Sequence, residues 1–115
     1  MLSARRAAEN EARFRQANEQ ISASAAELAP AEQPSPYLCE CDDEACTTIV
    51  RLTMSEYEAV RGGSRQFVLA GGHEGDDDRV LEEHELFTVV EKTGEKGRHV
   101  EELDPRSQEF RTGRP

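Results

Sequence analysis

The N-terminal quarter of the chain has the pattern of a single long helix. Residues 3–28 contain no Gly or Pro and are rich in Ala, Glu, Arg and Gln, which favour helical backbone. A narrow stripe recurs at intervals of seven residues, with two further positions beside it: Ala7, Phe14, Ile21, Leu28, Asn18 and Ala25. The stripe allows two interpretations, a helix that packs on its own domain and a helix that self-associates or docks on another protein.

Proline ends this pattern, and a strand and a short helix follow. Residues 30–36 hold three prolines among small and polar residues and are predicted to form a semi-stiff linker. The β-branched residues 47–52 predict a strand. Thr53 then lies three residues before Glu56, which is the spacing of a capping box at the start of a helix. The two glycines at 62–63 are expected to end that helix.

Two more strands are predicted, at residues 66–70 and 86–92. Between them, residues 71–78 are rich in Gly and Asp and are expected to be irregular. Their three consecutive aspartates lack the alternating ligand spacing of a calcium loop, so we expect a solvated acidic loop there. After a turn at 93–97, the chain up to residue 103 allows either a short strand or a helical turn.

These elements predict an α+β fold, in which a long N-terminal helix precedes a small antiparallel sheet with one short helix. The clustered cysteines of the run C-x-C-x4-C at 39–46 add a metal knuckle to this fold. The expected boundaries are 1–29 for the helix, 30–36 for the linker, 37–103 for the metal-binding domain and 104–115 for a flexible tail.

Composition indicates that such a domain needs stabilisation beyond its apolar core. The chain has 115 residues, a third of them charged, with no Trp, two Tyr and four Phe. A core this thin usually requires disulfides, a metal or a partner. Residues 37–103 carry 17 acidic against 7 basic residues, so this region repels polyanions and nucleic-acid binding is disfavoured.

All three cysteines lie within eight residues, in the spacing C-x-C-x4-C: Cys39, Cys41 and Cys46. In extended backbone the first two project to the same side, because strand side chains alternate. Asp42 and Asp43 favour a turn that would bring the third sulfur back. Structural Zn²⁺ takes four ligands in a tetrahedron, so one more ligand must come from farther along the chain.

His73 is the predicted fourth ligand. It follows a predicted strand and two glycines that allow a close approach of the backbone. His84 and His99 are expected to be exposed instead. If His73 is not the ligand, a carboxylate or a water must take its place.

Other chemistries compete with structural zinc. Clustered thiols also suit a redox switch or an iron–sulfur cluster. We expect the acidic neighbours of the cysteines to raise the thiol pKa values through like-charge repulsion. A hydrolase is disfavoured because three thiolates and one imidazole form a closed structural set, and the chain has no phosphate-binding loop, HExxH or Gly-x-Ser-x-Gly motif.

The cysteine spacing resembles the zinc knuckle that follows SET methyltransferase domains, over those eight residues only. A longer resemblance is to a family of small, largely uncharacterised bacterial proteins with an N-terminal helix and a C-x-C-x4-C…G-H motif. It is carried by the following residues: Pro36 to Cys41, Cys46, Ile49 to Thr53, Glu56, Tyr57, Val60, Arg61, Phe67, Val68, Gly72 to Glu74 and Val89 to Lys92. That family brings no established reaction with it.

The sequence therefore predicts a zinc-stapled protein-interaction module that is not an enzyme. The alternative is a thiol or zinc redox sensor that regulates a partner through the N-terminal helix. An odd cysteine count and a polar N-terminus favour a reducing cytoplasm, and no apolar run suggests a membrane span. The expected partner is a protein or a second copy, bound through helix 3–28. Loss of the metal is expected to unfold 37–103 and leave that helix largely intact.

Overall fold

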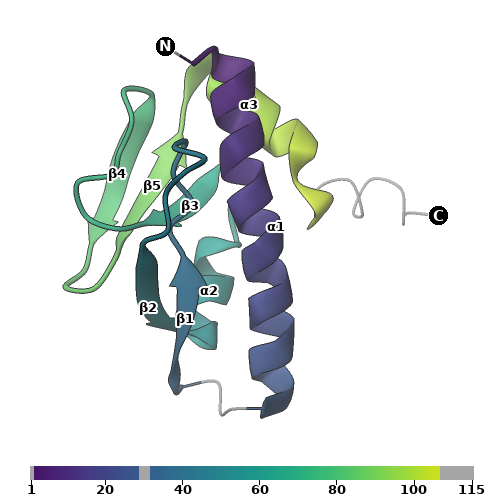
Figure 1. Cartoon of the computed structure of the whole chain (residues 1–115), viewed down its shortest axis with the longest axis vertical. Helices are drawn as coiled ribbons and strands as arrows, with labels where there is room; N and C mark the ends of the chain where they lie inside the picture. Colours follow the sequence, from purple (N-terminus) through teal and green to yellow (C-terminus); the bar gives the residue numbers. More distant parts are fainter. Residues whose placement is uncertain (1, 29–31, 107–115) are drawn as a thin grey trace.

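The computed structural model describes residues 2–28 and 32–106 and has the predicted α+β fold (Figure 1). A long N-terminal helix is followed by two small antiparallel sheets, a short helix between them and a C-terminal helix. The elements in chain order are α1 (Ala4–Leu28), β1 (Pro34–Leu38), β2 (Ile49–Thr53), α2 (Met54–Val60), β3 (Gln66–Leu69), β4 (Asp78–Glu83), β5 (Thr88–Lys92) and α3 (Gly94–Leu103). None of these helices is long and apolar enough to cross a bilayer.

The strands form two separate sheets. β1 pairs with β2, with Tyr37 opposite Val50. The other sheet has the order β3-β5-β4, and a bulge interrupts the β4–β5 pairing between Val80 and Glu82. A backbone hydrogen bond from Glu40 N–H to the Val68 carbonyl, 2.9 Å long, links the chain just after β1 to β3 in the other sheet.

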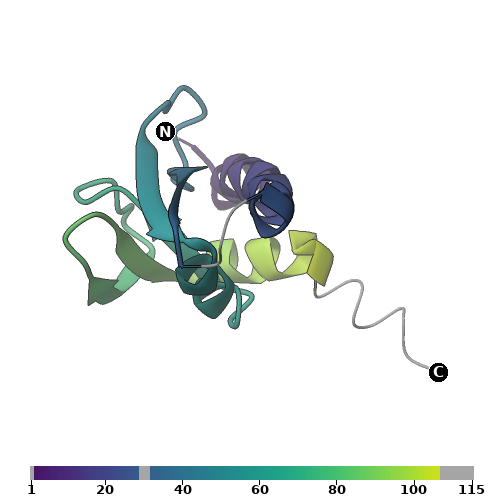
Figure 2. The same cartoon turned by 90° about the horizontal axis from the view of Figure 1, so that it is seen from below.

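The two longer helices lie together on one side of the strands. α1 runs along most of the molecule, α3 packs against it, and α2 lies near the β1–β2 hairpin (Figures 1 and 2). α2 begins with the predicted capping box, in which Thr53 Oγ1 accepts from Glu56 N–H and Glu56 Oε1 accepts from Thr53 N–H.

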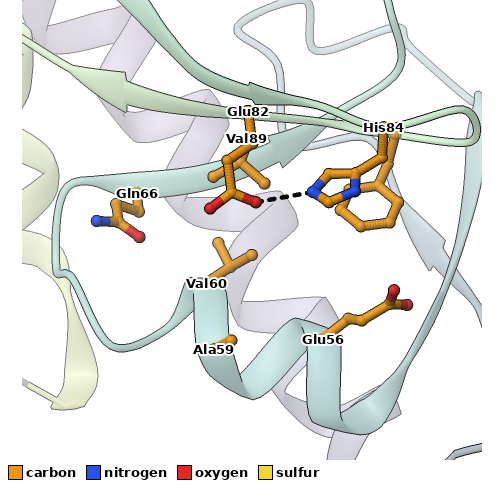
Figure 3. A pocket seen from close by; sticks show the side chains of 8 residues that line it. Glu56, Ala59, Val60, Gln66, Glu82, His84 and Val89 are labelled. Carbon is orange, nitrogen blue, oxygen red and sulfur yellow. Dashed lines mark hydrogen bonds and ion pairs between the residues drawn. The ribbon is translucent and has the colours of Figure 1, made fainter.

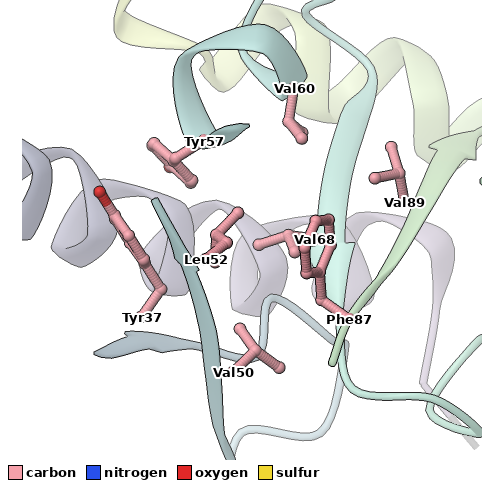
Figure 4. Close-up of a cluster of buried hydrophobic side chains, with 8 residues drawn as sticks. All are labelled: Tyr37, Val50, Leu52, Tyr57, Val60, Val68, Phe87 and Val89. Carbon is pink, nitrogen blue, oxygen red and sulfur yellow. The ribbon is translucent and has the colours of Figure 1, made fainter. Parts of the chain in front are cut away.

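The core consists of two apolar clusters. In the first, Tyr37 and Tyr57 stack with ring centroids 4.6 Å apart. The other members come from β2, β3, α2, β5 and the residue before β5 (Figure 4): Val50, Leu52, Val68, Val60, Val89 and Phe87. The second cluster contains two of the cysteines: Ala8, Cys39, Cys41, Phe67, Leu69, Val90 and Val100. The cysteine knuckle is therefore part of the core.

The buried face of α1 is mostly polar. Its buried positions include Glu11, Arg15, Asn18 and Ser22. The Arg15 guanidinium lies over the Phe67 ring, 3.6 Å from its centroid. Ala7 and Asn18 of the predicted stripe are buried within the chain. This matches the interpretation that the helix packs on its own domain. The side chain of Leu28 lies outside the described residues.

Two predicted segments without regular structure were wrong at their C-terminal ends. β1 begins at Pro34, inside the predicted linker, because an edge strand with a single neighbour tolerates prolines that donate no hydrogen bond. β4 begins at Asp78, the last residue of the predicted loop. Asp76 and Asp77 are exposed, as expected for a solvated loop. The Asp78 carboxylate is instead buried and paired with Lys92, whose Nζ is 2.9 Å from Oδ2.

Residues 94–103, for which a strand and a helical turn were both possible, form α3. Gly97 was expected to form a turn, but it lies inside α3. Glycine is needed there because a Cβ atom would lie 2.5 Å from the Lys92 carbonyl oxygen. The predicted flexible tail falls outside the described residues from 107 onward, while Asp104 is buried.

Candidate metal centre

The first two cysteines lie on extended backbone held between the two sheets. Cys39 N–H donates to the Thr48 carbonyl at 3.1 Å, and the next residue, Glu40, donates to Val68. This places Cys39 and Cys41 on the same side of the chain, as the sequence predicts. Both side chains are buried.

A tight turn returns the third cysteine to the first two. Asp43 Oδ1 accepts from Ala45 N–H at 3.0 Å, and the Asp43 carbonyl accepts from Cys46 N–H at 2.9 Å. An aspartate that bonds the backbone two residues onward favours this geometry. Cys46 thereby approaches the other two sulfurs and remains only half-buried.

His73 comes to the same place from the end of β3. Its N–H donates to the Ala70 carbonyl at 3.1 Å, and Gly72 adopts a φ of 87°, which favours glycine. His73 Nδ1 lies 3.5 Å from Cys39 Sγ and 3.7 Å from Cys46 Sγ. One ligand atom from each of Cys39, Cys41, Cys46 and His73 lies within 4.8 Å of the others, so these residues form a group that could hold a metal ion.

The spacing of these atoms fits a tetrahedral ion. With Zn–S bonds of about 2.3 Å and a Zn–N bond of about 2.0 Å, a tetrahedron separates sulfur from nitrogen by roughly 3.5 Å. The two measured sulfur–nitrogen distances are close to that value. The donor set of three thiols and one imidazole is also the kind that structural zinc prefers.

The cysteine thiols interact strongly with one another. Ala70 N–H donates to Cys39 Sγ at 3.2 Å, a contact that favours the thiolate. The hydrogen bond between Cys39 and Cys41 raises the pKa of Cys39 and lowers the pKa of Cys41 to about 5. The interaction between these two sulfurs is the largest cause of both shifts, so the increase expected from the acidic neighbours stays a prediction.

The sequence did not reveal the part that Glu40 has in supporting this site. Its carboxylate points away from the sulfurs into the protein, where Oε1 accepts from Val68 N–H at 3.0 Å and Oε2 accepts from Asn18 and from the Tyr57 hydroxyl. Glu40 thus connects the knuckle to β3, α1 and α2. A lone Glu between two cysteines carries no pattern that predicts burial.

The other two histidines lie elsewhere. His84 stacks on Phe87 with ring centroids 4.4 Å apart, and its Nε2 is 2.7 Å from Glu82 Oε1. His99 lies on α3 with its Nε2 3.4 Å from Glu95 Oε2. Neither belongs to the cysteine group. His84 is exposed as predicted, whereas His99 is half-buried, so the predicted exposure was wrong for His99.

Comparison of the chain with protein-family models, with curated proteins and with solved structures finds no match. The resemblance to a bacterial family therefore stays a prediction.

Proposed function

We propose that the protein is an interaction module stapled by one structural zinc ion, with Cys39, Cys41, Cys46 and His73 as ligands. The observation that carries the proposal is the convergence of these four ligand atoms within 4.8 Å. Four protein ligands complete a tetrahedral shell and leave no position for a substrate, which is typical of structural sites.

The ion would add a further link between the two sheets, which already share the hydrogen bonds between Glu40 and Val68 and the apolar clusters. Three ligands lie between β1 and β2 of the first sheet, and the fourth follows β3 of the second. Structural zinc contributes roughly 10–16 kcal/mol in zinc-finger peptides, which is comparable with the total stability of an ordinary domain. A chain with so few aromatic residues gains its stability from such a staple, and reduced thiols suit a cytoplasmic location.

Metal analysis of protein made without a histidine tag tests the proposal. We expect one zinc per chain, and in the cobalt-substituted protein a visible spectrum typical of tetrahedral sulfur-rich coordination. His73→Ala should weaken zinc binding by more than about tenfold, because even changes outside the ligand shell cost 10- to 100-fold. His84→Ala is the matched control. Absence of stoichiometric zinc, or equal effects of the two substitutions, would contradict the proposal.

A redox sensor is the second candidate, favoured by the position of the site at the surface. Cys46 is half-buried and His73 is exposed, so an oxidant can reach the ligand shell. In that reaction two thiolates transfer two electrons to one hydrogen peroxide, a sulfur–sulfur bond forms, two hydroxides are released and the zinc ion departs. Peroxide titration with a zinc indicator tests this. A protein that retains zinc and fold in millimolar peroxide is not such a sensor.

A further inference from the structure

A small pocket lies between α2 and the β4–β5 hairpin, apart from the metal-ligand group (Figure 3). Its volume is about 110 Å³. Apolar side chains from α2, from β5 and from the residue before β5 line the pocket: Ala59, Val60, Val89 and Phe87. Polar side chains complete the lining: Glu56, Gln66, Glu82 and His84.

The polar part of the pocket is acidic. Glu56 comes from α2 and Glu82 from β4, so two carboxylates approach the pocket from different elements (Figure 3). The contact between His84 Nε2 and Glu82 Oε1 orients both side chains, and the stacking of His84 on Phe87 supports the ring. No Lys or Arg is among the eight residues that line it.

A shallower depression of about 340 Å³ continues from the pocket and shares Glu56, His84 and Phe87 with it. Leu86 lines this second part with 62 % of its surface exposed. Glu85 adds another carboxylate there, and the lining holds one cation, Arg51. The two depressions together form a groove, which we call the His84 groove. One end is the pocket, which is lined by apolar side chains and two carboxylates, and the other end holds the exposed Leu86.

Size and charge indicate what this groove can hold. Pockets for cofactors and drug-sized ligands usually measure ~300–1,000 Å³, whereas an engineered cavity of ~150 Å³ holds one benzene. The pocket is therefore of a size for one side chain. A Lys or Arg side chain fits its chemistry, because the aliphatic stem can pack on Val60 and Val89 while the charged end meets Glu56 and Glu82.

We propose that the His84 groove binds an extended basic segment of another protein, with one Lys or Arg in the pocket and an apolar side chain two positions away against Leu86. In extended peptide these two side chains project to the same side. The acidic surplus of residues 37–103 attracts such a segment and repels nucleic acid. This inference rests on the proposed function as an interaction module and names its partner chemistry.

Fluorescein-labelled peptides test the groove directly. The probe is a twelve-residue peptide of three Lys-Ser-Leu-Ser repeats, and the comparison peptides replace every Lys by Glu or every Leu by Ser. We expect fluorescence anisotropy to detect saturable binding of the first peptide, weaker binding of the peptide without Leu and no binding of the Glu peptide. NMR shifts should map to the lining of the groove. No binding at millimolar peptide, equal binding of the Glu peptide or shifts confined to another face overturns the proposal.

Substitutions separate the groove from general charge attraction. Glu56→Gln preserves the capping box, since Gln also serves at that position. In combination with Glu82→Gln, it should weaken binding of the Lys-containing peptide about tenfold. Leu86→Ser should weaken it as well. The matched control is Glu83→Gln, which removes one charge from β4 outside the groove lining. Unchanged binding by the double variant, or an equal loss in the control, overturns the proposal.

Zinc content and melting temperature are measured for every variant. Failure of the metal proposal shows as protein that folds without zinc. Failure of the groove proposal shows as zinc-loaded, folded protein that does not discriminate between the peptides, so the two outcomes are distinguishable.

Discussion

Glu40 is a buried carboxylic acid between Cys39 and Cys41 of the cysteine knuckle. It lies between two predicted zinc ligands, yet its oxygens satisfy Val68 N–H, Asn18 and Tyr57 inside the protein. Burial raises the pKa of Glu40 above the usual value of 4.5, against the lowering effects of the Arg15 charge and of these hydrogen bonds. The folded protein therefore holds this proton more tightly than the unfolded chain does.

Replacement of this carboxyl should change both stability and its pH dependence. In Glu40→Gln the amide NH₂ must face at least one donor, so we expect a loss of about 1–3 kcal/mol in the free energy of unfolding. In the wild type, the contribution of Glu40 to the free energy of unfolding is fully present below about pH 4.5. It is lost as the pH rises through the raised pKa of this group. The cost of the substitution should therefore shrink as the pH rises above about 4.5 and through the raised pKa.

Urea unfolding of both proteins in excess zinc measures this difference. The pH dependence of zinc binding affects both proteins alike and cancels in the comparison. A cost that stays constant or grows with pH would be inconsistent with a raised pKa at Glu40.

At the scale of elements, α1 is held to the rest of the fold by polar contacts. Asn18 Oδ1 accepts from Leu38 N–H at 2.8 Å, and its Nδ2 donates to the Leu38 carbonyl and to Glu40. Nearer the N-terminus, Glu11 Oε2 lies 3.0 Å from Lys92 Nζ and 3.2 Å from Lys96 Nζ, in a fully buried cluster. Such groups are stable only while their partners stay in place.

Asn18→Ala should therefore be strongly destabilising. It leaves the N–H and carbonyl of Leu38 without their partner, and each unsatisfied buried group costs about 1–3 kcal/mol. We expect a loss of about 3 kcal/mol in chemical denaturation. Gln20→Ala is the control on the exposed face of the same helix and should stay within about 0.5 kcal/mol of the wild type. Similar values for the two variants would mean that α1 is only loosely attached.

At the scale of the whole molecule, the knuckle and α1 depend on each other. Asn10 Nδ2 donates to the Asp42 carbonyl at 2.9 Å in the turn between Cys41 and Cys46, and Asn18 reaches Glu40. Two of the cysteines lie in the same apolar cluster as Ala8 of α1. The fold therefore has no obvious boundary at which the helix could separate from the metal site.

These contacts change the expectation, drawn from sequence, that helix 3–28 survives loss of the metal. Chelation should abolish the near-ultraviolet circular dichroism and most of the helical signal in one transition, because a single isolated helix is only marginally stable in water. Hydrogen exchange measured before and after chelation, with zinc restored as the control, tests this. Protection that persists in α1 while the strands lose theirs would contradict it.

Local patterns explain the parts of the fold that were predicted correctly. The capping box at Thr53 and Glu56, the β-branched run before it and the strand over β5 depend on neighbouring residues, so the sequence reveals them. β1 and β4 were missed because their residues, prolines in one and charged groups in the other, form strands only through pairing with β2 and β5.

The four residues of the candidate metal centre could be identified from the sequence alone. Three cysteines within eight residues share one side of an extended chain and its turn, and a histidine after two glycines could join them, which follows from local geometry. Only the tertiary structure decided which polar residues would be buried. Glu11, Arg15, Asn18, Glu40 and Asp78 look like surface residues in the sequence, because the partners that make their burial possible lie far away along the chain.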